Sequence, residues 1–489
     1  METDMEEFDI DVLIVGAGAA GLAAAAALGH HGVATLVVEQ RPEPSTLPRA
    51  TVISTRSMEL LRAWGLEDEV LAGGVDADVW LWECPTLARA GEGRAHAVGY
   101  PSREQAAVVS PSAPGTVPQD WLEAVLRRHV GSLPSARLEL GTRLVDVDNA
   151  PDRVRATLRD RTGERRTVLA RYVIGADGAH SPVRHLLGVE MHERGGAYAG
   201  VQVVFRAPLW RVLGSLRYGL YVVTNPAAPG VFLPAGRDDR WVYGPTPTPE
   251  VEQPHDLEPA LLAEAIRQGA GLVDLDLSIE RIGPFHSPGQ LAGRFRAGRT
   301  FLAGDAAHRV TPRGGTGMNT ALQSGHDLGW KLAWVLQGWA GPDLLDTYEA
   351  ERRVVAEHNL ARSTDPNGSR RPVVDELSVD LGGRIAHAWM PSPAGPVSTL
   401  DLLGAAWTLF TGPSRDAWDA AASLSATPVT VRALDPVTAR AVGVRGDGAL
   451  LARPDGVPVG VWASAAGASD LHRAMASPGV IAAPDRAVA

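Results

Sequence analysis

The sequence predicts an α/β protein that combines a Rossmann-like domain with an antiparallel-sheet domain and a further C-terminal domain. Three observations support this prediction. An apolar strand, a glycine turn and an alanine-rich helix open the chain at 11–40. A tract rich in Val, Tyr, Trp, Pro and Gly follows at about 192–288. The length of 489 residues is too great for a single hydrophobic core.

The opening unit, DVLIVGAGAAGLAAAAALGHHGVATLVVEQ, predicts a strand, a helix and a second, parallel strand. Gly16 permits the tight turn, Gly18 lets the backbone approach a pyrophosphate, and Gly21 lets helix and strand pack closely. The helix N-terminus then favours the anion. Glu39 ends the second strand, where a carboxylate binds the ribose hydroxyls of an adenosine. These features together predict a dinucleotide site.

A second glycine-rich stretch, GDAAHRVTPRGGTGMN, lies at 304–319 after the strand RTFLAG. NAD normally needs only the first unit, whereas the ribityl chain and flavin of FAD extend beyond it and need further contacts. Asp305 can accept hydrogen bonds from ribityl or ribose hydroxyls. Gly314, Gly315 and Gly317 can expose backbone N–H groups at a helix start, where positive charge suits a reduced, anionic flavin. We therefore expect both loops to bind one FAD.

The remaining chain supplies further elements. Strands are expected at GVQVVFR, GLYVVT, GVFLPA and RWVYGP in the 192–288 tract, and the insertion 76–110, with VWLWE and AAVVS, is expected to add more. A helix is predicted over 319–339, although its two internal glycines disfavour a regular helix. The segment 364–372 resembles a linker, and a hairpin is predicted around a turn at 454–456.

Composition excludes several classes of function. A net charge of -11 opposes binding to nucleic acid or an anionic membrane. The single cysteine, Cys84, excludes an intrachain disulfide, a thiolate cluster and a CxxC redox pair. The acidic N-terminus lacks the basic start of a signal peptide, so a cytoplasmic protein is expected. No metal site is predicted.

Three motifs in order make the sequence similar to the FAD-dependent aromatic hydroxylases. These are the group A flavoprotein monooxygenases related to p-hydroxybenzoate hydroxylase, and the likeness is greatest to the bacterial aromatic polyketide hydroxylases. The motifs are GAGAAG with Glu39, ADGAHSPVR at 176–184, and GDAAHRVTPRGGTGMN, with WKLA following at 330–333. The expected division is an FAD-binding domain at 1–75, 111–191 and 289–371, a substrate-binding sheet domain at 76–110 and 192–288, and a thioredoxin-like domain without cysteines at 372–489.

The resemblance also implies roles for individual residues. Arg49 and Gln119 are expected to contact the FAD phosphates or ribityl chain, although a surface salt bridge or a turn contact is the alternative for each. Asp177 would serve both FAD and NAD(P)H. Pro312 would border the reacting edge of the flavin, and Met318 and Asn319 its pyrimidine edge. The full predicted cofactor site is Gly16, Gly18, Ala19, Ala20, Gly21, Glu39, Gln40, Arg41, Arg49, Gln119, Val145, Asp177, Gly178, Gly304, Asp305, Pro312, Gly314, Gly315, Gly317, Met318 and Asn319.

The sequence departs from the family pattern at three positions near this loop. Thr311 stands where a first proline is common, Thr316 occupies the variable slot between the glycines, and Ser324 replaces a frequent aspartate. None of these changes removes an expected flavin contact. His308 is expected to be a structural partner of the loop, and no catalytic acid or base is assigned.

The resemblance implies a reaction cycle. NAD(P)H binds transiently and reduces the flavin, O2 adds to give a C4a-hydroperoxide, and its distal oxygen passes to an electron-rich aromatic ring. A bulky aromatic substrate, phenolic or of polyketide type, is expected between flavin and sheet, in a monomer or homodimer. Six aromatic residues are candidate contacts, of which two or three should touch substrate: Trp80, Trp82, Tyr221, Phe232, Trp241 and Tyr243.

Other functions on the same scaffold remain open. A Baeyer-Villiger or epoxidising monooxygenase differs only in the oxygen acceptor. An FAD-linked dehydrogenase would not use O2, and a catalytically silent flavin-binding or ligand-binding protein would not turn over. A flavin-dependent halogenase is disfavoured, because the chain lacks a WxWxIP segment and has no lysine in its front half.

Overall fold

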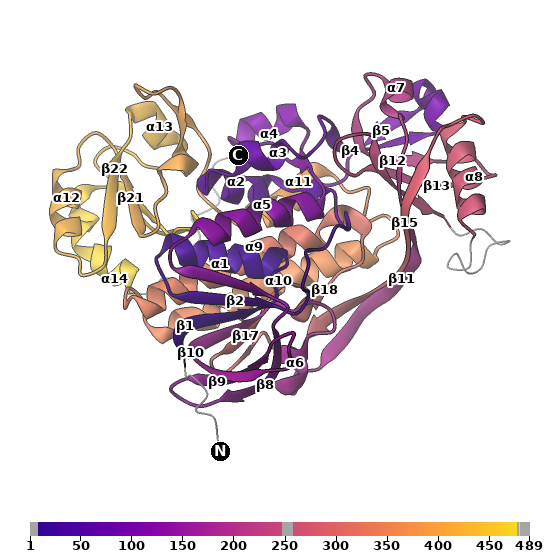
Figure 1. Ribbon diagram of the computed structural model, residues 1–489. Coiled ribbons are helices and arrows are strands. Elements are labelled where there is room, and N and C mark those ends of the chain that lie inside the picture. Colours follow the sequence, from indigo (N-terminus) through magenta and orange to yellow (C-terminus); the bar gives the residue numbers. More distant parts are fainter. Residues whose placement is uncertain (1–7, 247–257, 477–478, 480–489) are drawn as a thin grey trace, which may run out of the picture.

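The computed structural model describes residues 8–246, 258–476 and 479. The acidic residues 1–7, which helped to predict a protein without a signal peptide, lie outside this range. Figure 1 shows a central α/β body, with a large sheet on one side and a smaller α/β unit on the other. Within the described residues, no helix combines the length and the apolar character that a membrane crossing requires.

The central sheet has the order β16-β17-β10-β1-β2-β7. Its core strands β1 (Phe8–Val15), β2 (Thr35–Glu39), β10 (Arg165–Gly175) and β17 (Thr300–Leu302) pair in parallel. The three glycine motifs directly follow β1, β10 and β17. Because the carboxyl ends of parallel strands lie at one edge of a sheet, all three motifs meet there. The outer strands are β7 (Ala136–Leu140), β8 (Arg143–Asn149), β9 (Val154–Arg159) and β16 (Arg296–Ala297).

Helix α1 (Ala19–His30) packs directly on helix α9 (Gly317–Leu336). A Cβ added at Gly325 would lie 2.1 Å from the carbonyl oxygen of Ala20, and one at Gly329 would lie 2.6 Å from Cβ of Ala27. The two internal glycines expected to disturb α9 therefore permit close contact with the small side chains of α1. They leave α9 a continuous helix of 20 residues.

Other helices complete the central body. They are α2 (Thr55–Ala63), α3 (Glu67–Leu71), α4 (Arg103–Val109), α5 (Gln119–Ser132), α6 (Pro182–Leu186), α10 (Asp346–Thr364) and α11 (Val373–Leu381). The short strands β3 (Val52–Ile53) and β6 (Gly115–Thr116) pair beside them. Helix α4 includes the first four residues of the AAVVS segment, so the strand expected there is wrong. The capping box of Ser102 and Gln105 explains the helix start.

The second sheet has the order β18-β15-β11-β14-β13-β12-β4-β5. Its strands are β4 (Asp78–Cys84), β5 (Arg94–His96), β11 (Met191–Arg206), β12 (Tyr218–Val223), β13 (Gly230–Pro234), β14 (Arg240–Pro245), β15 (Ser278–Ala292) and β18 (His308–Arg309). All pairs are antiparallel except β4 with β12. The long strands β11 and β15 extend from this sheet along the central body (Figure 1). One face carries α7 (Trp210–Leu213) and α8 (Pro259–Ala270).

The C-terminal part contains a four-stranded sheet of order β22-β21-β23-β24 with helices beside it. Its elements are β21 (Trp407–Thr411), α12 (Asp416–Ser423), β22 (Val429–Ala433), α13 (Pro436–Ala441), β23 (Ala449–Ala452), β24 (Pro458–Trp462) and α14 (Leu471–Met475). A small hairpin of β19 (Trp389–Met390) and β20 (Val397–Ser398) precedes it. The predicted hairpin is present as β23 and β24, which pair antiparallel across the turn at 454–456.

A buried ionic cluster joins this turn to α9 and α10. The ammonium group of Lys331, which is 0% exposed, lies 2.9 Å from Oδ2 of Asp327 and 2.9 Å from Oε2 of Glu351. The guanidinium of Arg453 contacts the other oxygen of Glu351 at 2.9 Å and Asp455 at 2.6 Å. Two cations thus face three carboxylates inside the protein, so these five groups carry one excess negative charge when all are ionised.

Candidate active site

The first glycine loop fits closely against its neighbours. Gly16 has φ +107°, and a Cβ there would lie 2.3 Å from the carbonyl oxygen of Ala176 in the second motif. A Cβ at Gly21 would lie 1.9 Å from the carbonyl oxygen of Gly16. Gly18 begins α1 without a side-chain cap, and no acidic residue lies in the first turn. The N–H groups of this helix start therefore remain available to an anion.

Glu39 lies at this loop, as predicted from its place at the end of β2. Its two carboxylate oxygens accept hydrogen bonds from the backbone N–H groups of Ala17, at 3.0 Å, and Arg41, at 2.9 Å. Each oxygen keeps a second lone pair, so the carboxylate can still accept from a ribose hydroxyl.

Gln119 comes close to the same loop through a residue that the sequence did not reveal. Its amide donates to Oε1 of Glu123 at 2.7 Å, and that oxygen would lie 3.8 Å from a Cβ at Gly18. Burial raises the pKa of Glu123, opposed by the Gln119 hydrogen bond and by the charge of Arg49. The spacing of four residues on α5 is the only local signal that pairs Glu123 with Gln119.

The second motif is held mainly by its own loop. The carboxylate of Asp177 accepts from the Ser181 hydroxyl and, at 2.9 Å, from the backbone N–H of Val183. Burial raises the pKa of Asp177. Arg184, also unassigned from sequence, donates to the carbonyl oxygens of Ala306 at 3.1 Å and Ala179 at 2.9 Å. Arg184 therefore ties the second motif to the third.

The third motif brings Asp305 to the first loop. A Cβ at Gly304 would lie 2.9 Å from Cβ of Ala20. The side chain of Asp305 is exposed, whereas Gly304 and Ala306 are buried. Desolvation by the surrounding protein nevertheless raises the pKa of Asp305, and the charges of Arg309 and Arg49 oppose this rise. Arg49 thus acts on Asp305 of the third motif and on Glu123, whose carboxylate lies beside Gly18 of the first loop.

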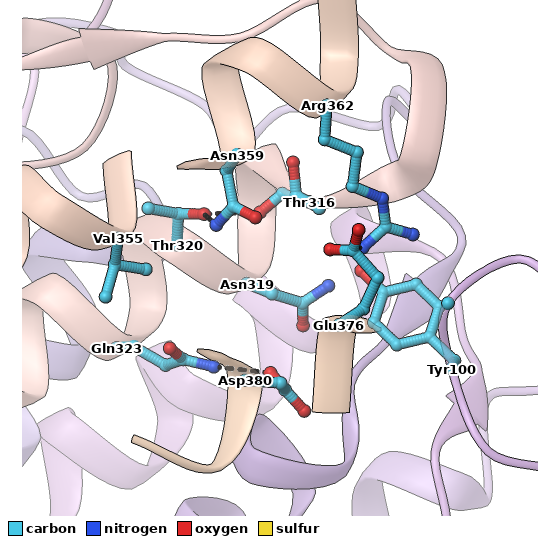
Figure 2. Close-up of a pocket in the computed structure, with 11 residues that line it drawn as sticks. Tyr100, Thr316, Asn319, Thr320, Gln323, Val355, Asn359, Arg362, Glu376 and Asp380 are labelled. Atoms are coloured by element: carbon cyan, nitrogen blue, oxygen red, sulfur yellow. Dashed lines mark hydrogen bonds and ion pairs between the residues drawn. The ribbon is translucent and has the colours of Figure 1, made fainter. Parts of the chain in front are cut away.

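Two side chains that line one pocket, Tyr100 and Asn319 (Figure 2), support the glycine turn of the third motif. The carbonyl oxygen of Gly315 accepts from the Tyr100 hydroxyl at 3.0 Å and from the Asn319 amide at 3.1 Å. Asn319 also bonds the backbone of Val52 and Ser54, at 3.1 and 2.8 Å. The Asn319 side chain is thus committed to protein contacts, and only its backbone remains for a cofactor.

Arg362 lies behind the same turn. Its guanidinium pairs with Glu376 at 3.0 Å, donates to the carbonyl oxygen of Val98, and lies 5.3 Å from the Tyr100 ring centre. A Cβ at Gly314 would lie 2.7 Å from Nε of Arg362. In front of the turn, α9 begins without a side-chain cap or an acidic residue in its first turn. A second helix N-terminus is therefore available for negative charge.

Of the three departures from the family pattern, two have a hydrogen-bond partner and the third has none among the described residues. Thr311 donates to the carbonyl oxygen of Ser363 at 2.5 Å, which anchors the turn on α10. The Ser324 hydroxyl lies 3.2 Å from Nε2 of His308. Burial lowers the pKa of His308 to about 3, in keeping with the expected structural role. The Thr316 hydroxyl is buried, with no partner among the described residues.

The predicted aromatic substrate contacts need correction. Tyr221, Phe232, Trp241 and Tyr243 are all 0% exposed and pack together on the sheet face covered by α7 and α8. The opposite face meets Tyr100 and the glycine turn, and it carries aliphatic residues such as Leu220. Alternation along each strand placed these four side chains on the covered face, so they form sheet core.

The other two candidates are only partly buried. Trp80 donates to the carbonyl oxygen of Tyr100 at 3.0 Å, and Trp82 donates to that of Ala90 at 2.9 Å. Trp80 packs with the cluster beside Tyr100, whereas Trp82 stacks on Tyr218 at the covered face. Of the six candidates, Trp80 alone packs on the face that meets the glycine turn.

Comparison with known proteins places this site in a family. The FAD binding domain family matches residues 9–363, and the family "aromatic-ring hydroxylase, C-terminal" matches 379–478. The chain belongs to the FAD-dependent aromatic-ring hydroxylases. As a member of this family it is an FAD-dependent monooxygenase.

Two curated relatives of this hydroxylase cover nearly all of it. The tetracenomycin A2 monooxygenase-dioxygenase of Streptomyces glaucescens is 34% identical, over 92% of this chain and 93% of its own. The aklavinone 12-hydroxylase RdmE of Streptomyces purpurascens is also 34% identical, over 93% and 95%. Among solved structures, a ternary complex of aklavinone-11 hydroxylase with FAD and aklavinone has a TM-score of 0.85. It is 30% identical and covers 97% of this chain and 99% of that one.

The arrangement in this hydroxylase fits FAD. The N-termini of α1 and α9 both lack a side-chain cap, and the charge of Arg49 acts on Asp305 in the third motif. Gln40, Arg41 and Pro312 are exposed near the two loops. Val145 lies on β8 at a register shift, and no described contact joins it to either loop.

We expect Asp305→Ala to weaken FAD binding at least about tenfold, because a hydrogen bond to a charged group contributes roughly 1.5–3 kcal/mol. Titration of the FAD-free protein, followed by the quenching of flavin fluorescence, measures the dissociation constant. Asp160→Ala, in the hairpin between β9 and β10, is the control and should bind FAD like the wild type. Unchanged affinity in Asp305→Ala would contradict the assignment.

Tyr100→Phe removes one of the two hydrogen bonds that the Gly315 carbonyl accepts. We expect the FAD dissociation constant to rise about twofold to tenfold, the range for one neutral hydrogen bond. Tyr221→Phe is the matched control, because its hydroxyl also donates to a backbone carbonyl, that of Leu216 at 2.6 Å, but in the sheet core. Equal effects of the two variants on FAD binding would argue against the role of Tyr100.

Proposed function

We propose that this hydroxylase inserts one oxygen atom of O2 into a bulky aromatic substrate, a polycyclic phenol of polyketide type, with NAD(P)H as the transient reductant. The observation that supports this best is the meeting of both glycine loops at one sheet edge. There Gly304, next to Asp305, packs against Ala20 at the start of α1, and α9 packs along α1. The named activities of two relatives, on tetracenomycin A2 and aklavinone, support the class of substrate.

Residues of the chain have distinct proposed roles in holding the cofactor. The start of α1, with Gln119 and Arg49, would bind the pyrophosphate, and Glu39 the adenosine ribose. Asp305 would accept from the ribityl hydroxyls. The N–H groups of Gly317 and Met318 would stabilise negative charge at the pyrimidine edge. When bound, FAD supplies the activation of O2.

The protein's remaining tasks are positioning and exclusion of water. Tyr100 and Asn319 fix the Gly315 carbonyl, and Arg362 fixes the chain behind it, so the turn that carries Pro312 has one defined position. A fixed turn holds reacting groups in register and limits the entry of water, which would otherwise divert the reaction. The sequence shows one dinucleotide fingerprint, so NAD(P)H would bind without a Rossmann unit of its own. A cytoplasmic monomer or homodimer remains our expectation.

Turnover with isotopically labelled O2 tests the proposal. The FAD-loaded protein is screened with polycyclic phenols and quinones for faster NAD(P)H oxidation, and products are examined by mass spectrometry. One labelled oxygen on the ring supports hydroxylation. A labelled ester or epoxide would favour the alternative monooxygenase reactions. Bound FAD without stimulated oxidation by any aromatic compound would favour a silent binding protein.

A further inference from the structure

One face of the β11–β15 ribbon carries accessible aromatic rings beside the glycine turn. Tyr198 and Phe285 stack with ring centres 5.7 Å apart and planes inclined by 27°. Both side chains are only partly buried, unlike the aromatic core of the opposite face. Gly200 pairs directly with Phe285, and a Cβ there would lie 3.2 Å from the Phe285 ring. The absence of a side chain at Gly200 leaves room for this ring.

The pairing pattern orients this face toward the central body. Tyr198, Gly200 and Gln202 alternate along β11 with Val201 and Val203, which belong to the covered core. Gln202 donates to the carbonyl oxygen of Pro48 at 3.2 Å, in the segment that leads to Arg49. The rings of Tyr198 and Phe285 therefore lie on the side of the ribbon that meets the predicted cofactor site.

The glycine turn adds a positive charge to the same place. Strand β18 pairs with β15, and the Ser287 hydroxyl donates to the Val310 carbonyl at 2.9 Å, so the ribbon and the turn are joined. The Arg313 guanidinium lies 5.0 Å from the Tyr198 ring centre. Within the described ranges, no carboxylate forms an ion pair with Arg313. The adjacent Pro312 is exposed.

We propose that Tyr198, Phe285 and Arg313 recognise the substrate: a planar ring system stacks on the two aromatic side chains, and an ionised phenol oxygen pairs with the guanidinium. This inference rests on the proposed function and names the residues that select its substrate. Stacking suits a fused aromatic system, because aromatic faces attract one another at these separations. An arginine without a carboxylate partner among the described residues suits an anionic oxygen, which binds it by a charge-assisted hydrogen bond.

The test uses FAD-loaded enzyme and a pair of probes. Alizarin is an acidic hydroxyanthraquinone, and its methyl ether at the acidic position cannot ionise there. Binding of each is measured by titration for the wild type, Phe285→Leu and Arg313→Gln. Arg217→Gln is the matched control, because the Arg217 guanidinium also lies over an aromatic ring, 4.5 Å from the centre of Trp210, at the covered face.

We expect Arg313→Gln to weaken alizarin binding about tenfold, the lower range for a charged hydrogen bond, and to leave the ether nearly unaffected. Phe285→Leu should weaken the binding of both probes about twofold to tenfold, because stacking does not require the charge. Arg217→Gln should leave both unchanged, and all variants should bind FAD like the wild type.

Other outcomes would overturn the inference. If Arg313→Gln weakened the binding of alizarin and of the ether equally, charge recognition would be refuted. Unchanged binding of both probes in Arg313→Gln and Phe285→Leu would refute the site. A rise in the KM for NAD(P)H alone would assign the rings to the nicotinamide or adenine instead. Failure of the proposed function looks different: the wild type itself would neither bind the probes nor oxidise NAD(P)H faster with any phenol.

Discussion

Replacing Gly325 by alanine is expected to lower the free energy of unfolding by about 1–3 kcal/mol, the usual cost of overpacking. The added methyl group would lie 2.1 Å from the carbonyl oxygen of Ala20, which is backbone and cannot rotate away. Helices α1 and α9 must then separate, and each begins at one end of the predicted FAD site. The variant should therefore also bind FAD more weakly. Chemical denaturation, with and without FAD, measures both effects.

Gly131→Ala is the matched control for this prediction. Gly131 lies in α5, and a Cβ there would have no neighbour within 4 Å. The same substitution should stabilise the protein by up to about 1 kcal/mol, because alanine loses less backbone entropy in a helix than glycine. Stabilisation by Gly325→Ala as well would show that α1 and α9 are not in the tight contact described.

Lys331→Met should destabilise the protein by roughly 3–5 kcal/mol at neutral pH, because it leaves buried carboxylates without their cation. The ammonium group is 0% exposed between Asp327 and Glu351. Arg453 remains as a partner for Glu351, so Asp327 is the group left uncompensated. Equilibrium unfolding in denaturant measures the loss.

The loss should shrink as the pH falls. Burial already raises the pKa of Asp327, and Lys331 opposes that shift. Without the lysine this pKa rises further, so protonation favours the folded state and removes the buried charge at acidic pH. Adding Asp327→Asn should recover part of the stability at neutral pH. Arg415→Met breaks an exposed pair with Asp419 and should cost at most about 0.5 kcal/mol at any pH. A defect of Lys331→Met that does not depend on pH would contradict this account.

Local backbone requirements were predictable from sequence, whereas contacts between distant segments were not. Gly16 and Gly21 are needed by the turn in which they occur, and Glu39 ends the strand that follows. The chain direction after each strand was enough to bring Asp305 to the same sheet edge. By contrast, Arg184, Tyr100 and Arg362 act on backbone carbonyls far along the chain, and no local pattern marks such partners.

The aromatic residues of the second sheet show a second limit of prediction from sequence. Tyr221, Phe232, Trp241 and Tyr243 alternate correctly with aliphatic residues, and this pattern identifies two faces. It does not say which face the helices cover, because both faces are largely apolar. Tyr198 and Phe285 were missed for a different reason, because they lie in stretches where most neighbouring residues are exposed and no apolar alternation marks them.

The ionic cluster also bears on the order in which the nascent chain becomes structured. Synthesis proceeds from the N-terminus, and domains generally fold as units while it continues. Glu351 forms an ion pair with Arg453, which is translated about a hundred residues later. On the ribosome, helix α9 therefore already contains Lys331 before Arg453, the second cation of the cluster, has been translated. The ion pairs of this cluster are therefore completed only after the 453–455 turn has been translated.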